Sequence, residues 1–270
     1  MQCGKFTLDV SSPKIMGILN VTPDSFSDGG KFIKLEQAHA QALRMQQAGA
    51  DIIDIGGEST RPMAQTVSLK QELSRVIPVI EALAPDLKIP ISIDTYKPEV
   101  MKAAVIAGAS MINDVTALAN VNSLKFAAEQ NIPVCLMHMQ KTPQNMQQQP
   151  QYKNVVKEVF EFLQKRLDLA QSYGINNLII DPGFGFGKTL EHNVELFKNL
   201  AKFTQLKVPL LVGISRKSMI GQILKLEKTQ DRIIGSVLAQ MIAVQNGANI
   251  IRTHDVLATR QSLDILDNLV

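Results

Sequence analysis

The stretch Gly49-Ala-Asp-Ile-Ile-Asp-Ile-Gly56 contains the unit from which this chain is built. Gly49 follows a helical pattern, and glycine is the residue that most often ends a helix. The run Asp51–Gly56 is rich in isoleucine without strict alternation, which is typical of a strand buried on both faces. The polar segment Glu58-Ser59-Thr60-Arg61 follows almost at once. This stretch therefore predicts a buried parallel strand that leads into a polar loop.

The same unit recurs along the whole chain. Further strands are predicted at Ile15–Asn20, Ile89–Asp94, Met111–Asp114, Val134–His138, Leu178–Asp181, Leu210–Gly213 and Ile250–Thr253. Helices are predicted between and after them, at Leu35–Ala48, Ser68–Leu83, Pro98–Ala107, Ser123–Glu129, Lys153–Ser172, Glu191–Phe203, Asp231–Gln245 and Leu257–Leu269. Eight strands, each followed by a helix, predict an α/β fold with a single (β/α)8 TIM barrel over residues 1–270.

The residues that precede the strands support this fold. Alternate strands follow a glycine at the end of a helix, at Gly49, Gly108, Gly174 and Gly247. The strands between them are entered through a proline, at Pro13, Pro90, Pro133 and Pro209, where a missing N–H costs no ladder hydrogen bond. Such an alternation agrees with a barrel whose interior layers come from alternate strands.

The composition excludes several classes of protein. The 270 residues are 45% hydrophobic and 20% charged, which is ordinary for a globular protein. A net charge of +3 and 5% aromatic residues argue against nucleic acid as a partner. No run approaches the roughly 18 apolar residues of a membrane span, and residues 1–10 lack an apolar signal core. Cys3 and Cys135 make no disulfide framework. We expect a cytoplasmic protein.

Polar residues end nearly every predicted strand, where barrels of this kind carry their active sites. Any one of them could serve only as a helix cap, but their recurrence at every strand indicates a functional mouth. Acceptor groups come from Asp94, Asn113 and Asp181, and they suit a flat heterocycle with amino and ring N–H donors. Cationic and N–H donors come from Arg61, Lys217, Arg252 and His254, and they suit a phosphate or diphosphate. The mouth therefore predicts a nitrogen heterocycle that carries an anionic tail.

Several other motifs of this chain do not match the functional sites that they resemble. The run Gly183-Phe-Gly-Phe-Gly-Lys-Thr189 lacks the first glycine of a Walker A loop and the spacing of a dinucleotide fingerprint. Its glycines instead predict a tight loop or a close approach to a ligand. His138 and His254 lack zinc-site spacing, while His39 and His192 are expected on the surface or in caps. Lys217 fits anion or ligand binding better than a Schiff base.

The segment Ile18–Gly30 begins in the first buried strand and continues into a polar loop. Loops this rich in functional groups usually serve a site, although its Pro, Asp and Gly residues are also ordinary turn residues. We expect residues 24–30, with Phe26 and Asp28, to form a lid that orders over bound ligands.

The motifs of this chain resemble those of the dihydropteroate synthase family, the folate enzymes that sulfonamides target. The matching segments are Ile15-Met-Gly-Ile-Leu-Asn-Val-Thr-Pro-Asp-Ser-Phe-Ser-Asp-Gly-Gly30, Asp54-Ile-Gly-Gly-Glu-Ser-Thr-Arg-Pro62, Ser92-Ile-Asp-Thr95, Ile112-Asn-Asp-Val115, Asp181-Pro-Gly-Phe-Gly-Phe-Gly-Lys188, Gly213-Ile-Ser-Arg-Lys-Ser218 and Arg252-Thr-His-Asp-Val256. They run in family order from residue 15 to residue 256. The resemblance implies condensation of 6-hydroxymethyl-7,8-dihydropterin diphosphate with 4-aminobenzoate, with Mg2+, to give 7,8-dihydropteroate and pyrophosphate.

The resemblance also implies roles for individual residues. The pterin would be held by Asp94, Asn113, Asp181 and Lys217, and the diphosphate by Asn20 through Mg2+, Arg61, Arg252 and His254. The aminobenzoate pocket would be framed by Phe26, Thr60, Arg61, Pro62, Phe186 and Ser218. Asp28, Lys217, Arg252 and His254 would be catalytic, with Asp28 facing a pterin-methyl cation that forms before the amine attacks.

Two departures from the family pattern fall in loops. Met63 and Lys141 stand where the family usually has glycine, which leaves loop geometry and sulfonamide affinity open. Two other functions remain as alternatives: a pterin-binding barrel without catalysis, and a pterin-dependent methyltransferase that acts on a corrinoid.

The predicted helix at 231–245 is apolar on nearly all sides, whereas an outer helix of a barrel should have a polar face. Neighbouring helices could bury it. We expect instead a homodimer through this helix and its neighbours, as a family dimer would also imply.

Overall fold

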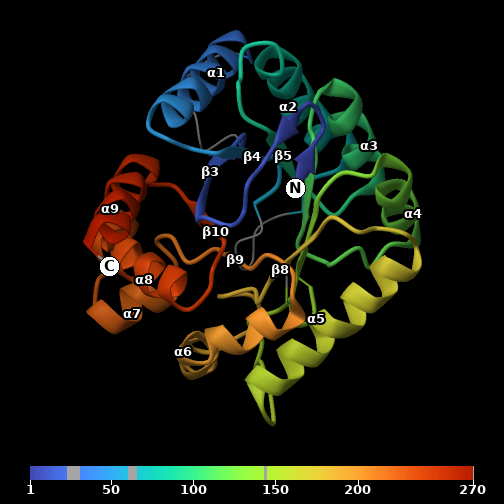
Figure 1. Ribbon diagram of the computed structural model, residues 1–270. Coiled ribbons are helices and arrows are strands. Elements are labelled where there is room, and N and C mark those ends of the chain that lie inside the picture. The colour runs from blue at the N-terminus through green and yellow to red at the C-terminus, as the bar shows by residue number, and fades with distance from the viewer. Residues whose placement is uncertain (23–30, 60–65, 143–144, 270) are drawn as a thin grey trace.

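The computed structural model describes residues 1–22, 31–59, 66–142 and 145–269. Within them, eight parallel strands form a barrel surrounded by helices (Figure 1). The barrel strands are β3 Lys14–Asn20, β4 Ile52–Gly56, β5 Ile91–Asp94, β6 Met111–Asp114, β7 Val134–Met137, β8 Leu178–Asp181, β9 Leu211–Val212 and β10 Ile250–Thr253. They pair in the order β8-β7-β6-β5-β4-β3-β10-β9, and a bridge between Ile180 and Leu210 closes the ring. The predicted (β/α)8 fold is confirmed.

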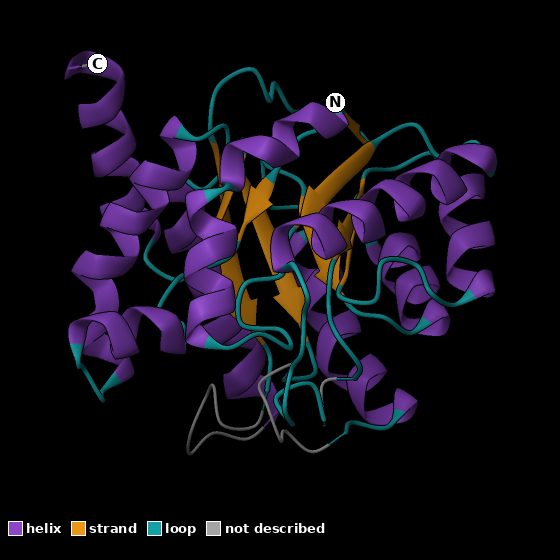
Figure 2. Ribbon diagram, turned by 90° about the horizontal axis from the view of Figure 1, so that it is seen from below, coloured by secondary structure: helices purple, strands orange, loops and turns teal. Residues whose placement is uncertain are grey.

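Helices follow the strands and cover the outside of the barrel, as the side view in Figure 2 shows. They are α1 Lys31–Gln47, α2 Leu69–Leu83, α3 Pro98–Ala107, α4 Val121–Gln130, α5 Val155–Ser172, α6 Leu190–Lys198, α7 Ser218–Leu224, α8 Ile233–Gln245 and α9 Val256–Leu269, with 3-10 helices η2 Leu200–Leu206 and η3 Thr229–Arg232. The predicted helix-ending glycines are confirmed, because Gly49, Gly108, Gly174 and Gly247 all have positive φ.

Three elements differ from the sequence prediction. The predicted helix 191–203 is divided into α6 and η2 at Asn199. Helix α7 was not predicted, and its Gly221 lowers the helical signal. The hairpin of β1 Gln2–Cys3 and β2 Phe6–Thr7 was not predicted either, since two residues carry no readable periodicity.

The hairpin closes one end of the barrel. Met1, Phe6 and Val10 pack against an interior apolar layer. That layer consists of Cys3, Leu8, Met16, Ile52, Met111, Cys135, Ile179, Leu211 and Ile250. A larger apolar layer fills the space between the strands and the helices. The polar site is thus left to the opposite end of the barrel interior.

Of the helices in the described residues, none is long and apolar enough to cross a membrane. The cytoplasmic location stays a prediction.

Candidate active site

The strand register gathers the predicted acceptors into one row. Asn20 pairs with Gly56, Gly56 with Asp94, and Asp94 with Asn113. Residues paired across parallel strands project to the same face of the sheet, so these side chains share the barrel interior. The row lies at the carboxyl ends of β3 to β6, where this fold carries its chemistry.

Arg252 occupies the middle of this polar interior. Its Nε donates to Asp54 Oδ2 over 2.7 Å, and its Nη2 donates to Asp94 Oδ2 over 2.8 Å. Asn113 Nδ2 also donates to Asp54 Oδ2, over 3.1 Å. One guanidinium therefore joins β4, β5 and β10 across the interior, and its planar set of donors suits this role.

Gly213 lies next to both Arg252 and Asp181. A Cβ atom on Gly213 would lie 3.7 Å from Arg252 Cβ and 3.9 Å from Asp181 Oδ2. Asp181 is therefore a neighbour of Arg252 around the end of β9. The structure thus brings together Asp94, Asn113, Asp181 and Arg252, four of the residues that the sequence pointed to.

Burial shifts the pKa values in this cluster. Burial raises the pKa of Asp94 to about 7, against the opposing effect of Arg252 and with the help of Asp54. Burial also raises the pKa of Asp181, while Lys217 acts in the opposite direction. For Arg252, burial lowers the pKa, but Asp54 and Asp94 outweigh it and the net shift is upward.

Three buried oxygen atoms of this interior are unsatisfied. Among the described residues, Asp54 Oδ1, Asp94 Oδ1 and Ser92 Oγ find no hydrogen-bond partner. A buried polar atom without a partner costs about 1 to 3 kcal/mol. Asp54 and Ser92 have no exposed surface, whereas the Asp94 side chain is 10% exposed, so Asp94 is the one of these three residues that a ligand with N–H donors could approach.

Lys217 precedes α7, and its side chain reaches the loop that follows β8. Its Nζ donates to Phe184 O over 2.5 Å and lies 4.6 Å from the centre of the Phe186 ring. Burial lowers the pKa of Lys217 to about 8, although Asp181 acts in the opposite direction. The amine is thus held near Asp181, and the two residues would bind the same ligand.

The glycine loop after β8 is a tight loop that packs against the protein's own backbone, which is one of the two roles that the sequence left open for its glycines. Gly183 has φ +71°, and a Cβ there would lie 1.8 Å from His138 O. Its N–H donates to Asp181 Oδ1 over 2.7 Å. The loop therefore orients one carboxylate oxygen of Asp181 as well as the backbone atoms around Lys217.

The loops after β9 and β10 are tied to each other. Ser215 Oγ lies 3.1 Å from His254 Nδ1 and accepts from His254 N over 3.2 Å. Arg216 forms a two-pronged ion pair with Asp255. His254 is therefore positioned by Ser215 in the loop after β9, while Arg216 is already paired with Asp255. Ser218 is exposed at the first position of α7.

The remaining predicted site residues lie outside the described part of the chain. They are Phe26, Asp28, Thr60, Arg61 and Pro62, together with the lid at 24–30 and the departure at Met63. The other departure, Lys141, has φ +63°, a conformation that glycine adopts without strain. Its Nζ donates to Gln148 O, over 2.5 Å.

Two residues of this region were missed from the sequence. Asp54 is fully buried and binds Arg252, and its signal was a carboxylate within the apolar run Ile-Ile-Asp-Ile. Lys188 is 3% exposed and braces the glycine loop through backbone carbonyls, which leave no trace in a sequence.

His192 forms a capping box with Thr189, which confirms a capping role. His39 Nε2 lies 2.8 Å from Asp86 Oδ2.

Comparison with known proteins identifies the class. The model of the pterin-binding enzymes matches residues 16–254. The Haemophilus influenzae dihydropteroate synthase is 52% identical over 260 residues, which cover 96% of this chain and 94% of that protein. A solved structure of the Xanthomonas albilineans dihydropteroate synthase with 4-aminobenzoic acid superposes with a TM-score of 0.94 at 48% identity, covering 99% of this chain and 96% of that chain. A structure of the same enzyme with 7,8-dihydropteroate gives 0.91 at 46% identity, covering 99% and 97%.

The fold, the polar interior and the family match define the chain as a pterin-binding enzyme. Within that class it belongs to the dihydropteroate synthase family.

Proposed function

We propose that the protein condenses 6-hydroxymethyl-7,8-dihydropterin diphosphate with 4-aminobenzoate to give 7,8-dihydropteroate and pyrophosphate. The observation that carries the proposal is the set of acceptors Asp94, Asn113 and Asp181 that the strand ends bring together around Arg252, with Asp94 Oδ1 lacking a hydrogen-bond partner among the described residues. Relatives bound to 4-aminobenzoic acid and to 7,8-dihydropteroate support the same reaction. A pterin carries amino and ring N–H donors, which are the groups that these acceptors lack.

The pterin would lie among Asp94, Asn113, Asp181 and Lys217. Asp181 Oδ1 accepts from Gly183 N, so Oδ2 on the Arg252 side is aimed at the interior. The carboxylates accept from the pterin N–H groups, while Asn113 and Lys217 offer donors to its oxygen and ring nitrogens. A flat heterocycle with donors on one edge and acceptors on another would thus be oriented by both.

The diphosphate would lie above the pterin, toward Arg252, His254, Asn20 and Arg61. Arg252 has five N–H donors, of which two bind Asp54 and Asp94. Its charge would stabilise the negative charge that grows on the leaving pyrophosphate.

The residues present fit Mg2+ as an ion that arrives with the diphosphate. Among the described residues, no group of three or more His, Cys, Asp or Glu could hold a metal. Mg2+ commonly binds through one or two protein oxygens together with substrate phosphates and water, and the Asn20 amide at the end of β3 would supply one such oxygen. When bound, the ion would neutralise charge on the leaving group.

The reaction requires the bond between the pterin methylene carbon and the diphosphate oxygen to break, and its electron pair leaves with pyrophosphate. The aminobenzoate nitrogen then attacks that carbon and loses a proton. Lys217 and Asp181 hold the ring while positive charge spreads over it, and Asp28 would face that charge. Phe186 and Ser218 would frame the aminobenzoate, together with Phe26, Thr60, Arg61 and Pro62.

The proposal is tested by incubating the protein with both substrates and Mg2+ while pyrophosphate and dihydropteroate are measured. Equal amounts of the two products are expected. Binding of the pterin without turnover would instead favour a non-catalytic pterin-binding barrel. In a separate incubation with a methylated pterin and a corrinoid, transfer of the methyl group to the corrinoid would favour the methyltransferase.

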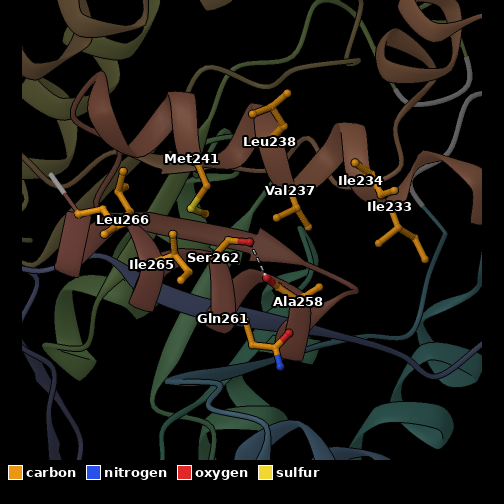
Figure 3. A pocket seen from close by; sticks show the side chains of 11 residues that line it. Ile233, Ile234, Val237, Leu238, Met241, Ala258, Gln261, Ser262, Ile265 and Leu266 are labelled. Carbon is orange, nitrogen blue, oxygen red and sulfur yellow. Dashed lines mark hydrogen bonds between the residues drawn. The ribbon is translucent and has the colours of Figure 1, made fainter.

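We also propose that the protein is a homodimer through α8 and α9. Helix α8 exposes large apolar side chains: Ile234 and Leu238 are 83% and 62% exposed, whereas Ser236 and Gln240 are fully buried. These exposed residues border a groove that Met241, Ile265 and Leu266 continue toward α9 (Figure 3). Ser262 in the groove donates to Ala258 O over 2.9 Å, so its hydroxyl is already paired. A second copy would bury this apolar surface, as an obligate interface does.

A further inference from the structure

Lys188 is a buried lysine that the proposed chemistry does not use. Its side chain is only 3% exposed. In the described part of the chain, no carboxylate lies within ion-pair distance of it. Buried lysines are rare unless they are paired, so the burial of Lys188 needs an explanation.

The amine of Lys188 spans three atoms of two loops. Its Nζ donates to Gly183 O over 2.8 Å and to Phe186 O over 3.1 Å, and it lies 2.9 Å from His138 Nδ1. An ammonium donates to all three atoms, whereas a neutral amine donates to the carbonyls and accepts from the imidazole. In either protonation state the amine of Lys188 holds the backbone of the loop 182–187 in place.

His138 is fixed just as firmly. It is 6% exposed, its ring meets Phe162 edge-on at 4.9 Å, and its backbone N donates to Asp181 O over 2.9 Å. Its carbonyl sits against Gly183, where a Cβ would come within 1.8 Å. The loop is therefore clamped between the backbone of His138 and the amine of Lys188.

The clamped loop is what holds Lys217. Lys217 Nζ donates to Phe184 O and lies over the Phe186 ring. Phe184 lies between the two residues Gly183 and Phe186 whose carbonyls Lys188 binds. Release of those carbonyls would free both contacts of Lys217 and admit water to its amine.

We propose that Lys188 and His138 form a positioning pair that fixes the loop 182–187 and, through it, the place and protonation of the Lys217 amine. The inference rests on the role proposed for Lys217 in holding the pterin. Neither member of the pair touches the substrate; each acts through the loop.

The charged groups that act on Lys217 are known from the structure. Asp181 and Asp94 favour its charged form, while Arg252 and its own burial disfavour it. Lys188 and Lys217 also repel each other when both are charged. Asp181, Asp94 and Arg252 remain in a Lys188→Met variant. Loss of the brace would return water to the Lys217 amine, so its pKa would rise from about 8 toward the ordinary lysine value.

The test measures Lys217 itself rather than turnover. The full-length protein is acetylated with a limiting amount of acetic anhydride across a pH series, and mass spectrometry follows the peptide that contains Lys217. We expect the labelling midpoint of Lys217 to rise by about one pH unit in Lys188→Met and to stay in place in Lys198→Met, which removes an exposed lysine of α6.

Substitutions at His138 give a second pair of variants. His138→Asn keeps an acceptor near the position of Nδ1, whereas His138→Leu removes it, so only the leucine variant should shift the midpoint. An unmoved midpoint in folded Lys188→Met and His138→Leu, with only a lowered melting temperature, would overturn the proposal. Absence of turnover in the wild-type protein would instead count against the proposed function and would leave this measurement valid.

Discussion

Arg252 on β10 donates to Asp94 on β5 over 2.8 Å at the carboxyl end of the barrel, although the two residues are 158 positions apart in the chain. This contact and the bond from Arg252 to Asp54 build the base of the site from three strands. The site is therefore assembled from buried charges, whose removal should have consequences for stability.

Replacement of Asp54 by alanine should destabilise the protein by about 3 to 5 kcal/mol, since it leaves the charge of Arg252 short of a buried partner. The matched control is Glu161→Ala, which removes a 3.8 Å ion pair on the exposed face of α5 and should cost about 0.5 kcal/mol or less. Urea unfolding measures both. Similar losses in the two variants would contradict a buried pair of this strength.

The raised pKa of Asp94 predicts a pH dependence of stability. Between the ordinary carboxyl value and about 7, the folded state holds a proton that the unfolded state has lost. The contribution of Asp94 to the free energy of unfolding should therefore fall as the pH rises through that window, and it should be level above about 7. The difference between the wild type and Asp94→Asn isolates this contribution, because Asp114, whose pKa is also raised, is present in both. A difference that rises with pH would contradict the assignment.

Alanine substitutions at Gly183 and Gly174 distinguish the cost of a steric clash from the cost of an unfavourable backbone conformation. Both have positive φ, but a Cβ on Gly183 would strike His138 O whereas none of the described atoms lies within 4 Å of one on Gly174. Gly174→Ala should cost about 1 to 2 kcal/mol, the strain of a left-handed alanine. Gly183→Ala should cost clearly more and should also reduce turnover, because it displaces the loop that holds Lys217. Thermal unfolding and initial rates report the two effects, and equal behaviour of the variants would exclude the steric explanation.

The apolar face of α8 predicts a dimer that a charge can break. The wild type should sediment as a dimer at micromolar concentration, and Leu238→Glu should sediment as a monomer. Ile106→Glu is the control, since Ile106 is 78% exposed on α3 and away from the groove. A wild-type monomer would refute the proposed interface.

The order of elements could be predicted from the sequence because parallel strands are apolar throughout and are bounded by glycine or proline. The same reasoning did not predict helix η2 as a separate element. Its buried residues Leu200, Phe203 and Leu206 recur every three positions, which is the period of a 3-10 helix, and the pattern merged with that of α6. Helix α7 was missed because its Gly221 lowers the helical signal, and a Cβ there would lie 2.8 Å from the backbone oxygen of Leu226.

The site could be predicted in part for a similar reason. Strand-end residues such as Asn113 and Asp181 face the mouth by register alone. The use of Arg252 as the partner of Asp54, and of Lys188 as a brace for carbonyls, depends on distances across the barrel. Such contacts join residues far apart in the chain and follow no local spacing.

The most direct test of the central claim is the rate of pyrophosphate release by Asp181→Asn and Lys217→Ala, measured with both substrates at saturating Mg2+ against the wild type and Lys198→Met. If the polar interior holds the pterin, kcat/KM for the pterin substrate should fall by about a hundredfold or more in the first two variants and stay unchanged in the third. Near-normal kcat/KM in either of the first two would contradict the role given to that residue.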